Sequence, residues 1–295
     1  MFQFLQRKQE PEKFGPDPDQ ISIRQLLEDS GVPISIKAVV TLPQHARQRL
    51  LRILLPPHLL TRFQIKPVDW RGPDGYEHVR LVMQPERGLL RVEVRHAAGA
   101  QDPFYNVELQ DNAMNGVDLN LLVLCDPLAP RFDTDRDEEG RETQFGVVRR
   151  NLAQEKRAME GGLAPGQVRA GLQASRDVFQ NVETFLAMMS HYSLFLEPLT
   201  YASAWVFERR GFAYVRGHKL MDDIHREFQE GGRLYRALDG STPFRHPDHW
   251  RTVRGRAWAV HDGILAEIDH SWDGLRMVKR VGQHAGVNTF PDAVY

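Results

Sequence analysis

The chain has 295 residues, of which 41% are hydrophobic and 26% charged, and its formal net charge is -1. A chain of this length can bury a sizeable core, in one large domain or two small ones. The near-neutral charge argues against a dedicated nucleic-acid binder, which is normally strongly basic. A single cysteine, Cys125, excludes an internal disulfide framework and a cysteine-rich zinc module.

No targeting segment is visible in the sequence. The first residues mix basic and acidic side chains and lack the continuous apolar stretch of a signal peptide. A membrane-spanning helix needs about 18 consecutive apolar residues, and the best candidate, 187–207, is interrupted by His191, Glu197 and Pro198. We therefore expect a cytoplasmic protein with a small-molecule substrate, without a nucleic-acid or membrane partner, and compatible with a homodimer.

Residues 1–63 are expected to form an arm, three helices and one strand. Residues 1–20 are polar and rich in proline, which predicts a flexible arm. A short helix is expected over 21–30, and the β-rich segment 34–40 predicts a first strand. Two further helices are expected, one from Pro43 to the prolines at 56 and 57, and one over 59–63.

From Val79 the apolar residues recur with a period of two. This pattern covers 79–83 and 90–94, with a turn at Gly88, and predicts a hairpin with one solvated face. Strands are also expected over 104–109 and 117–125, joined by a turn at Asn115-Gly116, a strong hairpin signal. We predict an antiparallel meander of about four strands.

The second half alternates helices and strands. Asn151 is a good N-cap for a helix within the polar segment 127–165. Pro165 and Gly166 precede a long helix that continues to Met189. Beyond it we expect the strand 193–196, the helix 198–211, the strand 212–215, the helix 218–228, and the strands 253–261 and 275–281.

These elements predict an α+β fold, with an antiparallel-rich central sheet flanked by helices. The core domain is expected over 21–216, with an inserted segment at 127–165. Residues 217–295 are expected to form a C-terminal α/β extension packed on this core.

Residues 194–212 resemble the last part of the GNAT acyltransferase superfamily. Leu194-Phe195-Leu196-Glu197 reads as a strand, and the helix after it ends in Val206-Phe207-Glu208-Arg209-Arg210-Gly211-Phe212, directly before another strand. The family has a helix ending in Leu-Tyr-x-x-x-Gly-Phe at this point. The resemblance covers about 20 residues, and the coarse order of elements before them is compatible with it, so it implies a GNAT-like core.

The resemblance also implies an acyl-CoA cofactor and a small amine as acceptor. The family's pyrophosphate loop is a Gln/Arg-x-x-Gly-x-Gly/Ala run after a strand. The nearest run here has a different spacing and comprises Gly166, Gln167, Val168, Arg169, Ala170 and Gly171. The amides of a helix start attract phosphate, so we expect the CoA pyrophosphate there. The family's helix tyrosine, often a general acid, falls on Phe207, so Tyr201 or Tyr214 would have to replace it. Tyr201 or Glu197 would handle the proton released by the attacking amine.

A second hypothesis is a metal-dependent enzyme. Most of the 12 His residues lie from His191 onward. His218, Asp222 and His225 share one arc of a helix, and the pairs 218/222 or 222/225 could bind Zn, Fe or Mn together with residues from elsewhere. His191, Glu197, His261 and Asp262 are available as such ligands, and His261 with Asp262 also forms a candidate acid/base pair at a strand end.

A third hypothesis is a non-catalytic binding or assembly protein. In this reading the polar groups named above are scattered over the surface, and a cavity or an exposed apolar patch recognises a ligand or a partner.

Overall fold

A computed structural model describes residues 33–144 and 148–295. The predicted arm, 1–20, and the predicted helix, 21–30, lie outside the described residues. Within them, seven strands form one mixed sheet in the order β1-β2-β3-β4-β5-β7-β6. The strands are β1 Val79–Gln84, β2 Leu89–Val94, β3 Tyr105–Asp111, β4 Val117–Leu124, β5 Ser193–Leu196, β6 Ala213–Arg216 and β7 Arg276–Arg280.

The predicted meander is confirmed. Strands β1 to β4 pair antiparallel in chain order, with Val79 opposite Val94 and Leu90 opposite Leu109. Alternation directs Leu90, Val92 and Val94 into the core. The opposite side of β2 carries polar residues such as Arg91, whose guanidinium lies 2.5 Å from the Glu108 carboxylate.

The rest of the sheet is built differently. β5 is parallel to β4, and β7 lies between β5 and β6 and is antiparallel to both. The last strand in the sequence is therefore an interior strand of the sheet. The α+β class and the flanking helices are confirmed.

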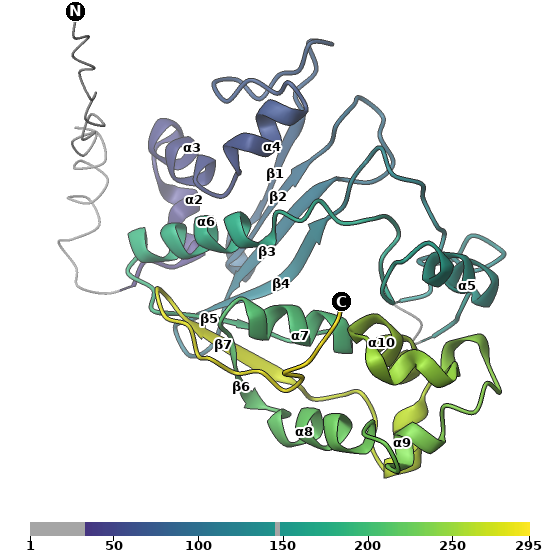
Figure 1. Ribbon diagram of the computed structural model, residues 1–295. Coiled ribbons are helices and arrows are strands. Elements are labelled where there is room, and N and C mark those ends of the chain that lie inside the picture. The colour runs from purple at the N-terminus through teal and green to yellow at the C-terminus, as the bar shows by residue number, and fades with distance from the viewer. Residues whose placement is uncertain (1–32, 145–147) are drawn as a thin grey trace, which may run out of the picture.

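Helices pack on the apolar side of the sheet, and Figure 1 shows α6 and α7 side by side in front of it. The longest is α6, Ser175–Met188, which contributes Val178, Phe179 and Phe185 to the main core. The others are α2 Ile36–Thr41, α3 Gln44–Arg52, α4 Pro57–Arg62, α5 Leu152–Glu160, α7 Tyr201–Arg209, α8 His218–Glu227, α9 Arg233–Arg236 and α10 Val253–His261.

A second core lies beside the sheet, on the outer side of α7. Tyr201 and Ala204 of α7 pack there against α8 and α10, and Leu275 joins them from the segment before β7. The segment that contains α5 packs against α10, where the Trp258 indole donates to the Leu163 carbonyl over 2.8 Å. The inserted segment 127–165 and the region after residue 217 therefore pack together (Figure 1).

Two predicted strands are helices in the structure. The first, 34–40, contains α2, because Ser35 caps the amide of Ala38 and the Asp111 carboxylate accepts from the amides of Ile36 and Lys37. The second, 253–261, is α10, which Thr252 caps at the amide of Gly255. The segment 34–40 is short and rich in β-branched residues, which favour a strand. α10 is buried on most sides, so it has no polar face to mark its period.

The long helix begins later than predicted. Residues 166–174 are not helical, and α6 starts at Ser175. Asn151 caps α5 as expected, accepting from the Gln154 amide. Within the described parts of the chain, no helix is both long and apolar enough to span a membrane.

Candidate functional site

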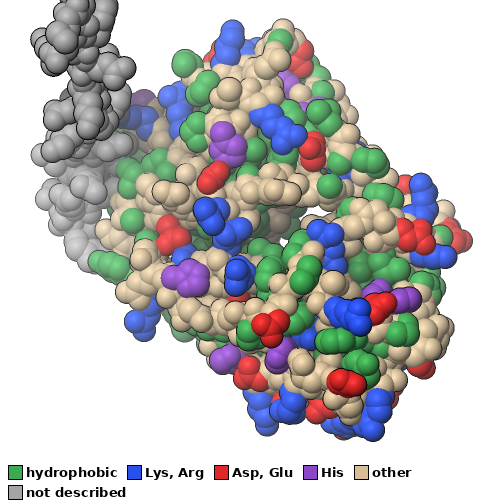
Figure 2. Space-filling model, in the orientation of Figure 1, with side chains coloured by type: hydrophobic (Ala, Val, Ile, Leu, Met, Phe, Trp, Pro, Cys, Tyr) green, Lys and Arg blue, Asp and Glu red, His purple; other side chains and the backbone are tan. Residues whose placement is uncertain are grey.

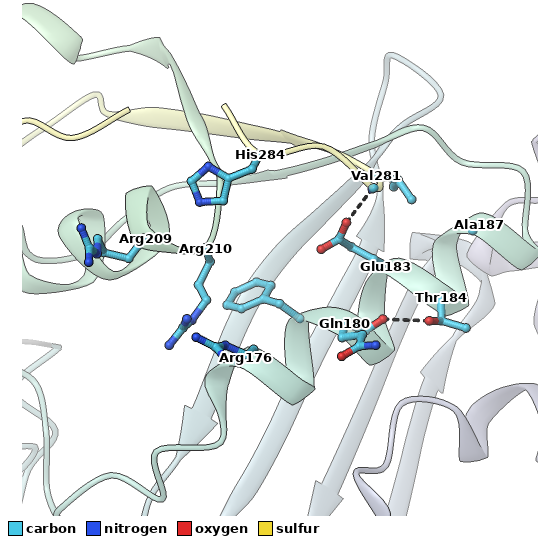
Figure 3. A pocket seen from close by; sticks show the side chains of 11 residues that line it. Arg176, Gln180, Glu183, Thr184, Ala187, Arg209, Arg210, Val281 and His284 are labelled. Carbon is cyan, nitrogen blue, oxygen red and sulfur yellow. Dashed lines mark hydrogen bonds between the residues drawn. The ribbon is translucent and has the colours of Figure 1, made fainter. Parts of the chain in front are cut away.

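A cationic cleft lies between α6, the end of α7 and the segment that follows β7. It has a volume of about 590 Å³, and Arg176, Arg209, Arg210 and His284 line it. The same four residues also line an adjoining hollow of about 530 Å³, which extends along α7 to Trp205. In Figure 3, Arg176 and Arg210 approach each other at one end of the cleft, with His284 above them.

The arginines of this cleft lack acidic partners. Among residues 33–144 and 148–295, no carboxylate lies within 4.0 Å of the guanidinium groups of Arg176, Arg209 or Arg210. Burial lowers the pKa of Arg210, and the charges of Arg176 and Arg209 lower it further, whereas the charge of Asp177 opposes the fall. Glu183 also lines the cleft, and its carboxylate is bonded to Lys279 and to the Gly282 amide. Three like charges held together in a cleft favour a bound anion.

The first turn of α6 opens at the same place. Its N-cap is Ala174, whose side chain makes no capping bond, whereas Asn151, Thr200 and Thr252 cap α5, α7 and α10. The start of α6 thus has no side-chain cap, and Asp177 is the acidic residue of its first turn. The positive end of the helix dipole adds to the arginine charges. Phosphate groups suit such a site.

The sheet opens beside this helix start. β4 pairs with β5 only at Val117 and Asp118, and the Leu124 carbonyl at its other end accepts from the Leu172 amide. In the described part of the chain, residues 119–123 of β4 therefore have no partner strand on that side. A bulge between β3 and β4 shifts the register at Glu108/Leu109 and bends the strand. Residues 121–124 of β4 are apolar but only half-buried. Figure 2 shows a hollow between the part that holds α6 and the part that holds α5 and α10.

The predicted pyrophosphate segment is not at a helix start. Gly171 forms a β-bridge with Cys125, and the Val168 carbonyl accepts from the Phe132 amide. Arg169 lies 3.5 Å from the Asp102 carboxylate. Gly166 and Gln167 belong to a turn in which the Gln167 amide donates to Ala164. Backbone groups of this segment therefore bind the end of β4 and the inserted segment, so they are already hydrogen-bonded.

The predicted catalytic residues occupy four separate places, and the last of these holds His261 and Asp262 together. Glu197 follows β5 with its side chain 61% exposed, and it shares Arg276 with Asp118 where β4 and β5 part. Tyr201 is buried in the second core. His191 is buried as well, and its Nε2 lies 2.8 Å from the Ile34 carbonyl. This contact joins the residues that follow α6 to the segment before α2.

His261 and Asp262 end α10, not a strand, and they belong to a dense charge network. His261 Nε2 lies 3.1 Å from the buried Glu155 carboxylate, and Arg150 bridges Glu155 and Asp262. Asp262 also accepts from Arg245 and from the Thr242 hydroxyl. These bonds join the inserted segment to α10, which indicates a structural role.

The three predicted metal ligands do not converge. His218 and Asp222 are 3.8 Å apart and more than half exposed, whereas His225 turns inward, with Nδ1 3.2 Å from a guanidinium nitrogen of Arg256. A guanidinium repels a metal cation. Over the residues that the structure describes, no group of three or more His, Cys, Asp or Glu could hold a metal ion.

The sequence reasoning missed the arginines of the cleft. Arg209 and Arg210 directly precede Gly211 in the quoted motif, but basic residues are frequent throughout the chain, and only the fold brings this pair next to Ser175 and Arg176. The comparisons with known proteins add nothing here, since no family model, curated protein or solved structure matches this chain.

Proposed function

We propose that this protein transfers an acyl group from acyl-CoA to a small amine. The observation that carries the proposal is the cationic cleft at the start of α6, beside the gap between β4 and β5. Coenzyme A carries a pyrophosphate and a ribose phosphate, which need several positive groups. Arg176, Arg210 and the amides at the start of α6 supply them from two helices at once.

The gap in the sheet suits the rest of the cofactor. The pantetheine arm of CoA is extended and contains two amide groups, so it can pair with the backbone of a strand that lacks a partner. The half-buried apolar residues 121–124 of β4 offer contact for its methylene groups. A cofactor bound this way would place its thioester where β4 and β5 part.

The topology supports the likeness to the GNAT superfamily. The order of meander, helix, parallel strand, helix and further strands agrees with the later part of the order that the resemblance implies, whereas the first strand of that order is helix α2 here. With the frame moved by three residues, Arg169 and Ala174 match the ends of the family's phosphate-loop pattern, but Leu172 stands where the pattern has glycine. Phe207 packs against Phe179 and Phe212 and cannot act as an acid.

Glu197 is the side chain best placed to accept the proton of the amine. It lies at the point of strand divergence, and Arg276, 3.1 Å away, holds it there. In the reaction the amine nitrogen attacks the thioester carbonyl carbon, the C–S bond breaks, and CoA leaves as the thiolate. Glu197 takes the proton that the amine loses, and this proton then passes to the thiolate to give the CoA thiol. Burial raises the pKa of Tyr201, so this residue is unsuited to act as a base.

The proposal is tested by binding and by turnover. Acetyl-CoA at millimolar concentration is expected to raise the melting temperature through preferential binding to the folded state. Free thiol should then appear when small primary amines are added. No thermal shift would contradict acyl-CoA binding. A shift without thiol release from any amine would identify a CoA-binding protein that does not catalyse this transfer.

A further inference from the structure

Arg256 of α10 is a buried cation without an acidic partner. Its side chain is among the largest that are fully buried, and the residue is only 1% exposed. Its Nε donates to the Trp250 carbonyl over 2.7 Å, and one terminal nitrogen lies 3.2 Å from His225 Nδ1. In the described part of the chain no carboxylate comes within ion-pair distance of it. An unpaired buried charge is costly, and a bound anion would relieve that cost.

Tyr201 of α7 provides a second free donor beside it. The residue is 1% exposed, and its hydroxyl has no hydrogen-bond partner among the residues described. The guanidinium of Arg256 opposes the rise that burial causes in the pKa of Tyr201, and the charge of Glu208, whose carboxylate is bonded to Tyr214 and Thr289, adds to that rise. A cation and an orphaned hydroxyl side by side are both donors, so the missing partner is an acceptor with negative charge.

Residues 289–295, here called the strap, cover this pair. The ring centre of Phe290 lies 3.5 Å from the guanidinium carbon of Arg256. Thr289 donates from its amide and its hydroxyl to the buried Glu208 carboxylate, and the Val294 carbonyl accepts from the Val253 amide. The Tyr295 ring stacks on Trp205 at the end of the strap, and Pro291, Asp292, Val294 and Tyr295 are exposed. Opening the strap therefore means breaking these contacts locally.

We propose that Arg256 and Tyr201 form a binding site for an aromatic carboxylate, and that the strap covers this site with Phe290 in the place of the ligand's ring. The carboxylate would lie in the plane of the guanidinium and accept from the Tyr201 hydroxyl. The site is separate from the cleft of Arg176 and Arg210, so the inference does not depend on acyl transfer.

The test uses benzoate as the probe and neutral benzamide as its matched control, with calorimetric titration of the full chain. Phe290→Ala removes the covering ring and leaves a cavity of similar shape, which can admit a free ring. Benzoate is expected to bind this variant at least tenfold more tightly than it binds the unmodified protein. Benzoate should also bind the variant tenfold more tightly than benzamide binds the same variant. Equal binding of the two probes would overturn the proposal, since the charge of Arg256 would then play no part.

Tyr201→Phe, combined with Phe290→Ala, separates binding from structure. The Tyr201 hydroxyl has no partner, so its removal should leave the melting temperature unchanged or raise it, while benzoate binding weakens about tenfold. The matched control is Tyr192→Phe, because Tyr192 is 77% exposed, whereas Tyr201 is buried. Unchanged benzoate affinity in the Tyr201 variant would contradict the assignment.

A measurement on the unmodified chain guards against misfolding of the variants. Saturating benzoate should open the strap and speed hydrogen exchange of the Thr289 amide severalfold, and benzamide should not. Exchange that is the same with and without benzoate would refute the covering role. Coenzyme A binding, measured on the same samples, reports on the other cleft and keeps the two proposals distinguishable.

Discussion

Arg210, at the end of α7, donates a hydrogen bond from its Nε to the hydroxyl of Ser175, the first residue of α6, over 3.1 Å. The bond joins the last turn of one helix to the first turn of its neighbour. It holds the guanidinium where burial and two further arginines make its charge unfavourable. Such an arrangement is typical of residues kept for a ligand at some expense in stability.

Arg210→Gln tests this trade-off. Without ligand, the free energy of unfolding should stay within about 0.5 kcal/mol of the unmodified value or rise, since one like charge leaves the cleft. Coenzyme A affinity, measured by calorimetry, should fall about tenfold with the loss of a charge-assisted hydrogen bond. The control is Arg236→Gln, an exposed arginine outside the cleft. Equal CoA affinity in both variants would argue against a phosphate site here.

Glu208→Ala is expected to destabilise the protein by about 2–4 kcal/mol. The carboxylate is fully buried and accepts from the Tyr214 hydroxyl and twice from Thr289, so its removal leaves three buried donors unpaired. Tyr214→Phe removes one donor only and should cost about 1 kcal/mol. Urea unfolding measures both, and a loss in Glu208→Ala no larger than that in Tyr214→Phe would contradict this account.

The network around Glu155 predicts an acid-sensitive region. Burial alone would raise the pKa of Glu155, but hydrogen bonds from His261 and Arg150 and the charge of Arg150 lower it below 4.5. A lowered folded-state pKa stabilises the protein above the unfolded value of 4.5, and this contribution is lost as the pH falls through the folded value. Unfolding free energy measured from pH 6 to pH 3 should decline less steeply in Glu155→Gln than in the unmodified protein.

Cys125 should be unreactive in the native protein. It is 6% exposed, and its thiol points to the Pro103 carbonyl at 3.4 Å. Burial, with the nearby charge of Asp102, raises the pKa of Cys125 to about 11, so little thiolate exists at pH 8. Iodoacetamide labelling at pH 8 should follow the unfolding equilibrium across a urea series. Rapid labelling without urea would show an accessible thiol instead.

The elements that could be predicted from the sequence are those marked by residues within the element itself, such as a periodic apolar pattern or a residue that ends a helix. The period of two from Val79 fixes the meander, and Asn151 and Gly211 mark helix ends by their own chemistry. The segments 34–40 and 253–261 carry no such signal, because their helical state depends on caps and on burial in contacts made far along the chain. Asp111, for example, binds the start of α2 from a distant strand.

The site was harder to predict than the fold, for a related reason. Ser175, Arg210 and His284 are far apart in sequence, and each alone is an ordinary surface residue type. They matter because the fold brings them together, and this requires the end of α7 to lie against the start of α6. The residues that stood out in the sequence, such as His261 and Asp262, instead form ion pairs between the end of α10 and the inserted segment.

The interior position of β7 has a consequence for how the chain folds as it is synthesised. β5 and β6 do not pair with each other, and each meets its common neighbour only when residues 276–280 leave the ribosome. Until then both strands expose open edges, which invite pairing with other chains. Ribosome-bound nascent chains that stop just short of β7 should therefore depend on chaperones more than those that include it.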